Sequence, residues 1–339
     1  MGIGIRPAAI VASLACAALF GCGGGESSRR DSPVAEYEVH EWGLVHGAAG
    51  DTVESSAIPT TPVYVESIAD KPVLYFHADA PIALRRVAVI PRDGVVREHW
   101  PLASTVPNPS VVRWTGVRID ADACTPRPLP RANERPCSDS PIGADCEASS
   151  LAIVRTASAR CVRTSAGDES FLFYRSTSRS FVPPLAVGSE PSGAIRIERR
   201  RAEEIPGEVL VLFRDADGVH VARTTMRPDV RTVGPAEAIG GAIEGRASIV
   251  ATMRAIGLDD AEADAFLRAW SDSLFGPTAD VEDERAADRI SADGTPASAR
   301  GRSVLYFLPA ESADALATLE FDPRPRRVAR AIAVLEPVP

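Results

Sequence analysis

Lysine is almost missing from this chain of 339 residues: Lys71 is the only one, and the other 36 of its 37 basic residues are arginine. This bias indicates a GC-rich genome, so the number of arginines does not predict phosphate binding. Acidic residues outnumber basic ones by 46 to 37, which gives a formal net charge of −9. That balance argues against a nucleic-acid partner and against electrostatic attachment to an anionic membrane.

The signatures of several enzyme classes are missing as well. The chain has no G-x-S-x-G elbow, and its lysine stands one position too far from Ser67 to complete an S-x-x-K motif. Gly240, Gly241 and Gly245 precede a predicted helix, but the Gly-Lys-Ser/Thr of a phosphate-binding loop does not follow. A carboxylate pair for glycoside hydrolysis would leave no spacing pattern. The sequence therefore favours a protein that is not an enzyme, and it predicts no cofactor.

The apolar run that follows Arg6 is too short to cross a bilayer, which takes roughly 20 apolar residues. It ends in Leu19-Phe20-Gly21-Cys22. These features resemble the signal peptide of a bacterial lipoprotein, in which the cysteine is acylated and the leader is cut off before it. We therefore expect residues 1–21 to be the leader and Cys22 to carry lipid.

Residues 22–35 are rich in glycine and serine, which predicts a flexible tether between the membrane and a folded body. Gly23 stands where an aspartate marks inner-membrane retention in some bacteria, so the outer membrane is favoured. The acyl chains would hold the protein to lipid, because each buried methylene contributes about 0.8 kcal/mol. Two alternatives stay open: an ordinary cleaved signal peptide without lipid, and a chance match to the lipoprotein motif.

The chain also lacks the closely spaced cysteine pairs that structural zinc sites prefer. Cys16 leaves with the predicted leader. Four cysteines remain for the body, separated by 12, 8 and 14 residues: Cys124, Cys137, Cys146 and Cys161. An even number in an exported chain predicts two disulfides, and the spacing leaves all three pairings open. These bonds would restrain the proline-rich loop 120–161.

A regular alternation of strands and helices is missing, which argues against a parallel Rossmann-type sheet. Most periodic segments are short, β-branched or alternating in polarity, as strands are. Asp93-Gly94 and Asp217-Gly218 predict hairpin turns between such segments. The predicted fold class is mainly β, with antiparallel, sandwich-like sheets. Strands are expected at 37–45, 62–65, 72–77, 86–90, 95–100, 111–119, 152–156, 171–174, 195–198, 208–213, 219–224, 303–308, 317–321 and 328–335.

One helical hairpin is expected among these strands, at residues 247–276. Gly257 separates its two helices, and Asp259 and Glu262 have the spacing of a capping box at the start of the second. Residues 277–301 are acidic and poor in large apolar side chains, which predicts a mobile loop. The length of the chain favours about two domains, which we place at 36–190 and 191–339.

The most distinctive motif of the predicted body is Val39-His40-Glu41-Trp42-Gly43-Leu44. It resembles the opening of a large, essentially uncharacterised family of secreted bacterial proteins, in which His-Glu-Trp-Gly is usually followed by Thr-Phe. This chain departs from that pattern at Leu44-Val45 and by a loop after Gly276. The resemblance implies no established activity, but it implies that this motif is the shared signature and that the body is one unit. It extends through residues 72–76, 100–101, 171–175 and 301–306.

A strand carrying this motif would turn His40 and Trp42 to one face and Glu41 to the other. His46 would share the face of His40, so a metal or general-base site could use both histidines. The favoured alternative is structural, with Trp42 in the core and with His40 and Glu41 bound to backbone or arginine partners. The H-E-x-x-H zinc motif is absent because Leu44 stands at its second histidine. The sequence therefore predicts no metal site.

The remaining histidines are expected to have no part in a site. His77 and His99 lie in β-patterned, aromatic segments, where isolated structural histidines are common. His220 follows a predicted turn and is expected to be exposed.

Together these features predict a lipid-anchored protein of the bacterial cell envelope that acts as a binding or structural module. Its expected partners are the membrane, through the lipid, and an envelope protein or a glycan. The alternative is a secreted, metal-assisted hydrolase that uses His40, Glu41 and His46.

Overall fold

The helices and strands of the computed structural model lie between Val34 and Val338. The structure describes residues 34–46, 67–103, 110–120, 122, 124–125, 148–155, 158–179, 181–215, 218–276 and 301–338. Several predicted features lie outside these residues: the leader 1–21, Cys22, most of the tether 22–35, the strand 62–65, Cys137, Cys146 and residues 277–300 of the acidic loop.

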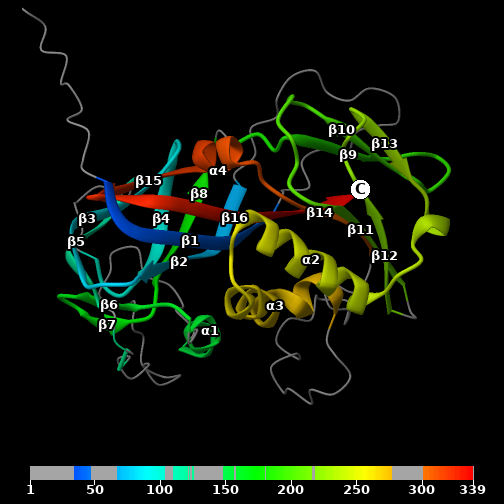
Figure 1. Ribbon diagram of the computed structural model, residues 1–339. Coiled ribbons are helices and arrows are strands. Elements are labelled where there is room, and N and C mark those ends of the chain that lie inside the picture. The colour runs from blue at the N-terminus through cyan, green and yellow to red at the C-terminus, as the bar shows by residue number, and fades with distance from the viewer. Residues whose placement is uncertain are drawn as a thin grey trace, which may run out of the picture. The chain divides into compact units, whose positions relative to one another are not determined.

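A large sheet of eight strands runs through the centre of the fold (Figure 1), in the order β12-β11-β14-β16-β1-β2-β8-β4. Neighbouring strands are antiparallel, except that β1 and β16 are parallel. The strands are β1 (Val34–His46), β2 (Ser67–Ala78), β4 (Gly94–Trp100), β8 (Leu172–Ser178), β11 (Val209–Asp215), β12 (Gly218–Thr224), β14 (Gly301–Phe307) and β16 (Arg324–Val338).

Two smaller antiparallel sheets complete the strands of the described chain. A five-stranded sheet has the order β15-β3-β5-β6-β7 and a three-stranded sheet the order β13-β10-β9. The first contains β15 (Ala317–Asp322), β3 (Ile82–Pro91), β5 (Val112–Asp120), β6 (Cys161–Thr164) and β7 (Gly167–Glu169); the second contains β13 (Val230–Val233), β10 (Ile195–Arg199) and β9 (Leu185–Ser189).

The two faces of the large sheet pack against different layers because successive side chains of a strand point to opposite faces. On one face, Trp42 of β1 packs in a cluster with the helical residues Phe266 and Met253. On the other face, Phe76 of β2 packs with Trp114 of the five-stranded sheet. Farther along that second face, strands of the large sheet pack against the three-stranded sheet and the helix that follows β14. The large sheet is therefore a central layer with a helical layer on one side, and with the two small sheets and the helix after β14 on the other.

The predicted helical hairpin is present as α2 (Ala242–Ile256) and α3 (Asp260–Phe275). Gly257 ends α2 with a left-handed φ of 113°, as a C-terminal glycine commonly does. The predicted capping box begins α3: the backbone N–H of Asp259 donates to Glu262 Oε2 and the N–H of Glu262 donates to Asp259 Oδ1, both at 2.9 Å. The remaining helices are α1 (Ala148–Val154), η1 (Pro235–Glu237) and α4 (Ala310–Leu316).

The mainly β fold class with antiparallel sheets is confirmed, and two details differ from the predictions. The segment 152–156 is not a strand, since α1 occupies Ala148–Val154; a short apolar run does not distinguish the two. Asp93-Gly94 makes a turn, with Asp93 at a φ of 46°, but β3 and β4 on either side belong to different sheets and form no hairpin. Strands β11 and β12, which flank the predicted turn at Asp217-Gly218, do pair with each other as expected, and Asp217 itself lies outside the described residues.

The large sheet contains strands from both sides of the expected domain boundary at 190/191. Strand β1 from the first half lies between β2 and β16, and β16 comes from the end of the second half. The two halves of the sequence therefore build the large sheet together.

Candidate functional site

The signature strand β1 directs its residues alternately to the two faces of the large sheet. Trp42 is fully buried on the helical side, where its ring meets Phe266 of α3 edge-on at a centroid distance of 5.6 Å. His40 lies on the same side, and Glu41 lies on the opposite side among residues of β8 and β16. The signature therefore contributes to two separate sets of contacts.

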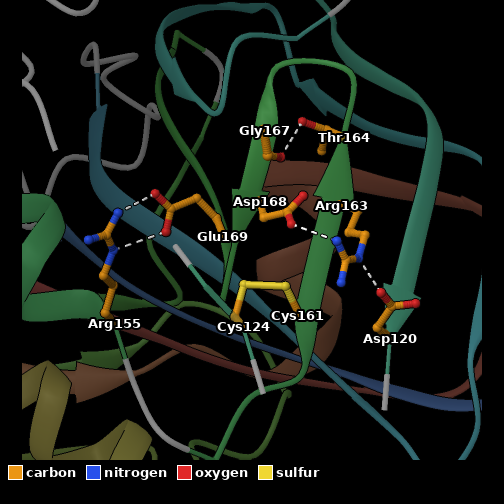
Figure 2. Close-up of a disulfide and its surroundings, with 9 residues drawn as sticks. All are labelled: Asp120, Cys124, Arg155, Cys161, Arg163, Thr164, Gly167, Asp168 and Glu169. Carbon is orange, nitrogen blue, oxygen red and sulfur yellow. Dashed lines mark hydrogen bonds and ion pairs between the residues drawn. A yellow bond between two sulfur atoms is a disulfide. The ribbon is translucent and has the colours of Figure 1, made fainter. Parts of the chain in front are cut away.

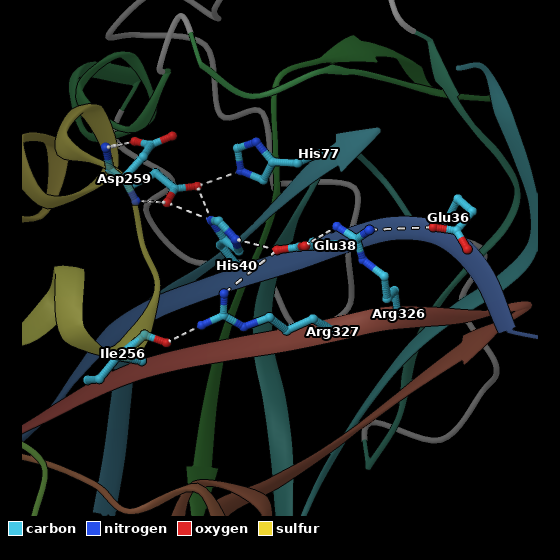
Figure 3. A network of polar contacts seen from close by, with 9 residues as sticks. Glu36, Glu38, His40, His77, Ile256, Asp259, Arg326 and Arg327 are labelled. Atoms are coloured by element: carbon cyan, nitrogen blue, oxygen red, sulfur yellow. Dashed lines mark hydrogen bonds and ion pairs between the residues drawn. The ribbon is translucent and has the colours of Figure 1, made fainter. Parts of the chain in front are cut away.

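His40 belongs to a cluster with His77 of β2 and Glu262 of α3 (Figure 3). His40 Nδ1 lies 2.8 Å from Glu262 Oε2, and His77 Nε2 lies 2.9 Å from Glu262 Oε1. The two imidazole rings are 4.3 Å apart between centroids. Three elements that are distant in sequence thus place two ring nitrogens and a carboxylate at one point.

The pairing of β1 with β2 places the histidines together. His40 stands opposite Tyr75 and Glu38 stands opposite His77, so the two histidines are diagonal neighbours on one sheet face. Diagonal neighbours in an antiparallel pair lie within reach of long and aromatic side chains. The prediction that His77 is an isolated structural residue is therefore wrong.

The capping box of α3 fixes the position of the Glu262 carboxylate. Its bond from the N–H of Asp259 holds the side chain back over the first turn of the helix. The first turn also carries the positive end of the helix dipole, which stabilises an anion there. The glutamate of the capping box is therefore also the residue that joins the two histidines.

The electrostatics of the cluster favour an ionised carboxylate. Burial opposes the charge on Glu262, but the hydrogen bonds with His40 and His77 outweigh it and lower its pKa to about 2. Burial likewise opposes a charge on His40, yet the neighbouring carboxylates of Glu262 and Glu38 raise its pKa. The cluster thus holds a buried negative charge between two imidazoles.

Glu38 lies behind His40, on the side away from Glu262. Its Oε2 atom is 3.6 Å from His40 Nε2, and its Oε1 atom accepts a hydrogen bond of 2.5 Å from Arg326. Arg327 lies 3.9 Å from the same carboxylate and donates to the carbonyl of Ile256 at 2.8 Å (Figure 3). The hydrogen bond from Arg326 outweighs burial and lowers the pKa of Glu38. Glu38 is therefore an ionised, arginine-bound partner of the second nitrogen of His40.

Glu41 has a structural environment in the opposite layer. Arg330 stands directly opposite Glu41 on β16 and donates from Nε to Glu41 Oε2 at 2.5 Å. The hydroxyl of Tyr174 donates to Glu41 Oε1 at 2.7 Å. All three side chains are buried. Glu41 therefore does not share a site with His40.

His46, the other expected partner of His40, shares its sheet face but not its location. Six residues of β-strand span about 20 Å, far more than a metal site bridges. His46 instead packs edge-on against Trp270 at a centroid distance of 5.9 Å. The structure therefore does not assemble His40, Glu41 and His46 into one site.

The last residue of the signature, Gly43, has a packing role. A Cβ atom there would lie 3.1 Å from the Cα of Pro72, closer than side chains normally approach. The neighbouring strand thus restricts this position to a small residue.

The two other histidines lie apart from the cluster. His99 is buried and packs edge-on against Trp114. His220 is half-exposed and pairs with Asp215 at 3.2 Å.

One disulfide links Cys124 to Cys161 at the start of β6, 37 residues along the chain (Figure 2). It lies among the ion pairs of Arg163 with Asp120 and of Arg155 with Glu169. The predicted disulfide framework is thus confirmed for these two cysteines. Cys137 and Cys146 lie outside the described residues.

Comparisons with family models, with curated proteins and with solved structures find no significant match to this chain. The resemblance to the His-Glu-Trp-Gly family therefore stays a prediction. What the arrangement can do must be argued from its chemistry: two imidazoles and a carboxylate are a donor set that divalent transition metals bind.

Sequence reasoning identified two members of this cluster for other reasons and missed their association. Glu262 was expected only as a helix cap, and it is separated from His40 by 222 residues and from His77 by 185. No local spacing connects residues so distant in sequence. The one available indication was His77 itself, a histidine that alternates onto the same face as apolar neighbours of β2.

Proposed function

We propose that the chain is a lipid-anchored protein of the bacterial cell envelope whose β-rich body serves as a binding module. The observation that supports this proposal best is the Cys124–Cys161 disulfide, because such bonds persist in exported proteins and are rare in the reducing cytosol. The lipoprotein motif at Cys22 agrees with it. Among the described residues, no helix is long and apolar enough to cross a membrane.

The proposed ligand is an envelope protein or a glycan, and the proposed location is the outer membrane. The acidic net charge of −9 disfavours nucleic acid as a ligand. Gly23 after the lipidated cysteine favours the outer membrane. The tether of residues 22–35 would let the body reach ligands away from the bilayer surface.

The anchor is tested by expressing the full chain in a diderm bacterium and labelling it with an alkyne fatty acid. The parent chain should incorporate label and sediment with membranes, whereas Cys22→Ser should be unlabelled. Cys16→Ser is the matched control, because this leader cysteine is removed on cleavage and its loss should leave labelling unchanged. Equal labelling of Cys22→Ser would refute the anchor.

The ligand is sought with the lipidated protein, by chemical crosslinking in intact cells and by cosedimentation with purified peptidoglycan. Glycan binding predicts saturable cosedimentation that soluble peptidoglycan fragments compete away. Protein binding predicts a discrete crosslinked species that Cys22→Ser loses when it no longer reaches the membrane. Absence of both would contradict a binding module.

The alternative function, a hydrolase that uses His40, Glu41 and His46, gains no support from the geometry. Glu41 is held by Arg330 and Tyr174 on one side of the large sheet, and His40 lies on the other. His46 is remote from both along the strand.

A further inference from the structure

The cluster of His40, His77 and Glu262 has the composition of a metal centre. The donor atoms of the three side chains all lie within 4.8 Å of one another. They come from β1, β2 and α3, so the fold, not a flexible loop, brings them together. We propose that these three residues bind a divalent transition metal, namely zinc. This proposal is independent of the lipid anchor and goes beyond the binding function proposed above.

The donor separations suit such an ion with a small adjustment. Zinc takes imidazole nitrogens and carboxylate oxygens at about 2.0–2.2 Å, so neighbouring donors of a tetrahedral site lie about 3.3–3.5 Å apart. The nitrogens of His40 and His77 now lie 2.8–3.1 Å from the Glu262 oxygens, which is hydrogen-bond distance. Replacing the shared protons by an ion therefore requires each donor to move outward by only about half an ångström.

The surroundings orient these donors for a metal. Ligating histidines commonly donate their other N–H to a carboxylate, which fixes the tautomer and the ring. Glu38 occupies that place behind His40, with Oε2 3.6 Å from Nε2, while Nδ1 on the other side of the ring faces Glu262 at 2.8 Å, where the ion would replace the shared proton. Arg326 and Arg327 hold the Glu38 carboxylate in turn. The capping bond from Asp259 orients Glu262 in the same manner.

The site is reached from the side of His77. The side chain of His77 is 24% exposed, that of His40 is 9% exposed and that of Glu262 is fully buried. Three protein ligands leave a fourth position of tetrahedral zinc for water or an external ligand. The partly exposed edge of His77 is where such a ligand would enter.

The test uses the full chain, extracted from whole cells in detergent whether or not it sediments with membranes, purified without a histidine tag and treated with a chelator under non-reducing conditions. Cobalt(II), a spectroscopic substitute for zinc, should produce visible d–d bands of a tetrahedral site that saturate at one ion per chain. Zinc should then displace the cobalt and bleach the bands. No visible bands would overturn the proposal, as would an added thiolate charge-transfer band, which would assign the metal to cysteines.

Variants identify the ligands. His77→Ala and Glu262→Gln should lose the cobalt bands while the far-ultraviolet circular dichroism stays that of the parent. His220→Ala, which removes a histidine outside the cluster, should leave cobalt binding unchanged. If Glu262→Gln fails to fold, His77→Ala decides alone, because its partly exposed side chain tolerates truncation. Unchanged cobalt binding in His77→Ala would overturn the assignment.

The role of Glu38 is tested separately. Glu38→Gln should weaken the affinity for cobalt by about 10- to 100-fold without changing the stoichiometry, as loss of a carboxylate behind a ligating histidine does. Glu36→Gln is the matched control, because Glu36 lies on the same strand and its side chain is 84% exposed. Equal affinities of the two variants would overturn the orienting role of Glu38.

Discussion

At the scale of single residues, the signature strand shows how one short motif contributes to two unlike environments. His40 faces a polar cluster on the helical side, and its neighbour Glu41 is buried with Arg330 between sheets. The alternation of side chains was predictable from the sequence. The partners were not, because Arg330 follows Glu41 by 289 residues and only the pairing of β1 with β16 brings them together.

The buried Glu41–Arg330 pair makes a stability prediction. Glu41→Ala should lower the free energy of unfolding by about 3–5 kcal/mol, because it removes the buried counter-charge of Arg330 and leaves only the exposed carboxylate of Asp314 paired with it. The measurement is urea denaturation followed by circular dichroism. Arg85→Met, which removes an ion pair at the exposed rim with Asp322, should leave the urea midpoint unchanged. Equal effects of the two substitutions would contradict the assignment.

His99 predicts a pH dependence. Burial lowers its pKa below the ordinary value of 6.5, so the unfolded chain binds a proton more readily than the folded one. The stabilisation from a neutral His99 is therefore present above about pH 6.5 and is lost as the pH falls below it.

The check is to compare the urea midpoint at pH 8 and pH 5 in the parent chain and in His99→Phe. The loss of stability at pH 5 should be smaller in the variant, because one buried group no longer gains a proton on unfolding. His220→Phe, at a half-exposed position, should lose as much stability as the parent. A parent and a His99→Phe variant with the same pH dependence would refute the prediction.

At the scale of elements, the helical hairpin was the part most completely predicted. Local chemistry specifies it: a glycine ends α2 and a reciprocal cap begins α3, and both are visible in a few adjacent residues. The sequence predicts a strand at 152–156, where α1 ends, because short apolar segments occur both in buried strands and in helices. Turn chemistry predicts a hairpin at each of two sites: β11 and β12 do pair across the site at Gly218, but β3 and β4 on either side of Asp93 belong to different sheets.

The cap of α3 should contribute measurably to stability. Asp259→Ala removes the acceptor for the N–H of Glu262 and should cost about 0.5–2 kcal/mol of unfolding free energy. Asp259→Ser keeps an acceptor at the same position and should retain most of the stability. A Ser variant as unstable as the Ala variant would mean that the cap is not the cause.

The end of α2 makes a second prediction at this scale. Gly257 has a φ of 113°, and a Cβ there would displace the guanidinium of Arg327, which donates a hydrogen bond to the carbonyl of Ile256. Gly276 has a φ of 81° with open space around it. Gly257→Ala should therefore destabilise the protein more than Gly276→Ala, which suffers only the backbone strain of about 1–2 kcal/mol. Thermal melts of both variants compare the two effects directly.

At the scale of the whole molecule, the sequence predicts the stacked sheets but not the order of the strands within them. Alternating strands indicated sheets that cover one another, and the structure has a central sheet with two smaller ones on one face. The sharing of the large sheet between the two halves was not predictable, since strand order depends on contacts between distant segments. The same limitation concealed the cluster of His40, His77 and Glu262.

The Cys124–Cys161 bond closes a loop with a sequence separation of 37, so its loss should lower the free energy of unfolding of the whole protein. Chain-entropy reasoning gives about 4 kcal/mol for a loop of this length, and Cys161→Ser should approach that loss in urea denaturation. Mass spectrometry of a non-reduced digest should recover the Cys124–Cys161 crosslinked peptide. A digest that links either cysteine to a different one would contradict the observed pairing.

Because β1 pairs with β16, part of the large sheet can form only after the last described strand has been synthesised. The first strand of the described body lies beside the last one in the middle of the large sheet. Until β16 has been synthesised, β1 can pair only with β2, its other edge has no neighbouring strand, and Glu41 lacks the guanidinium of Arg330. Contacts between such distant segments form slowly. A growing chain therefore cannot complete the large sheet before β16 has been synthesised.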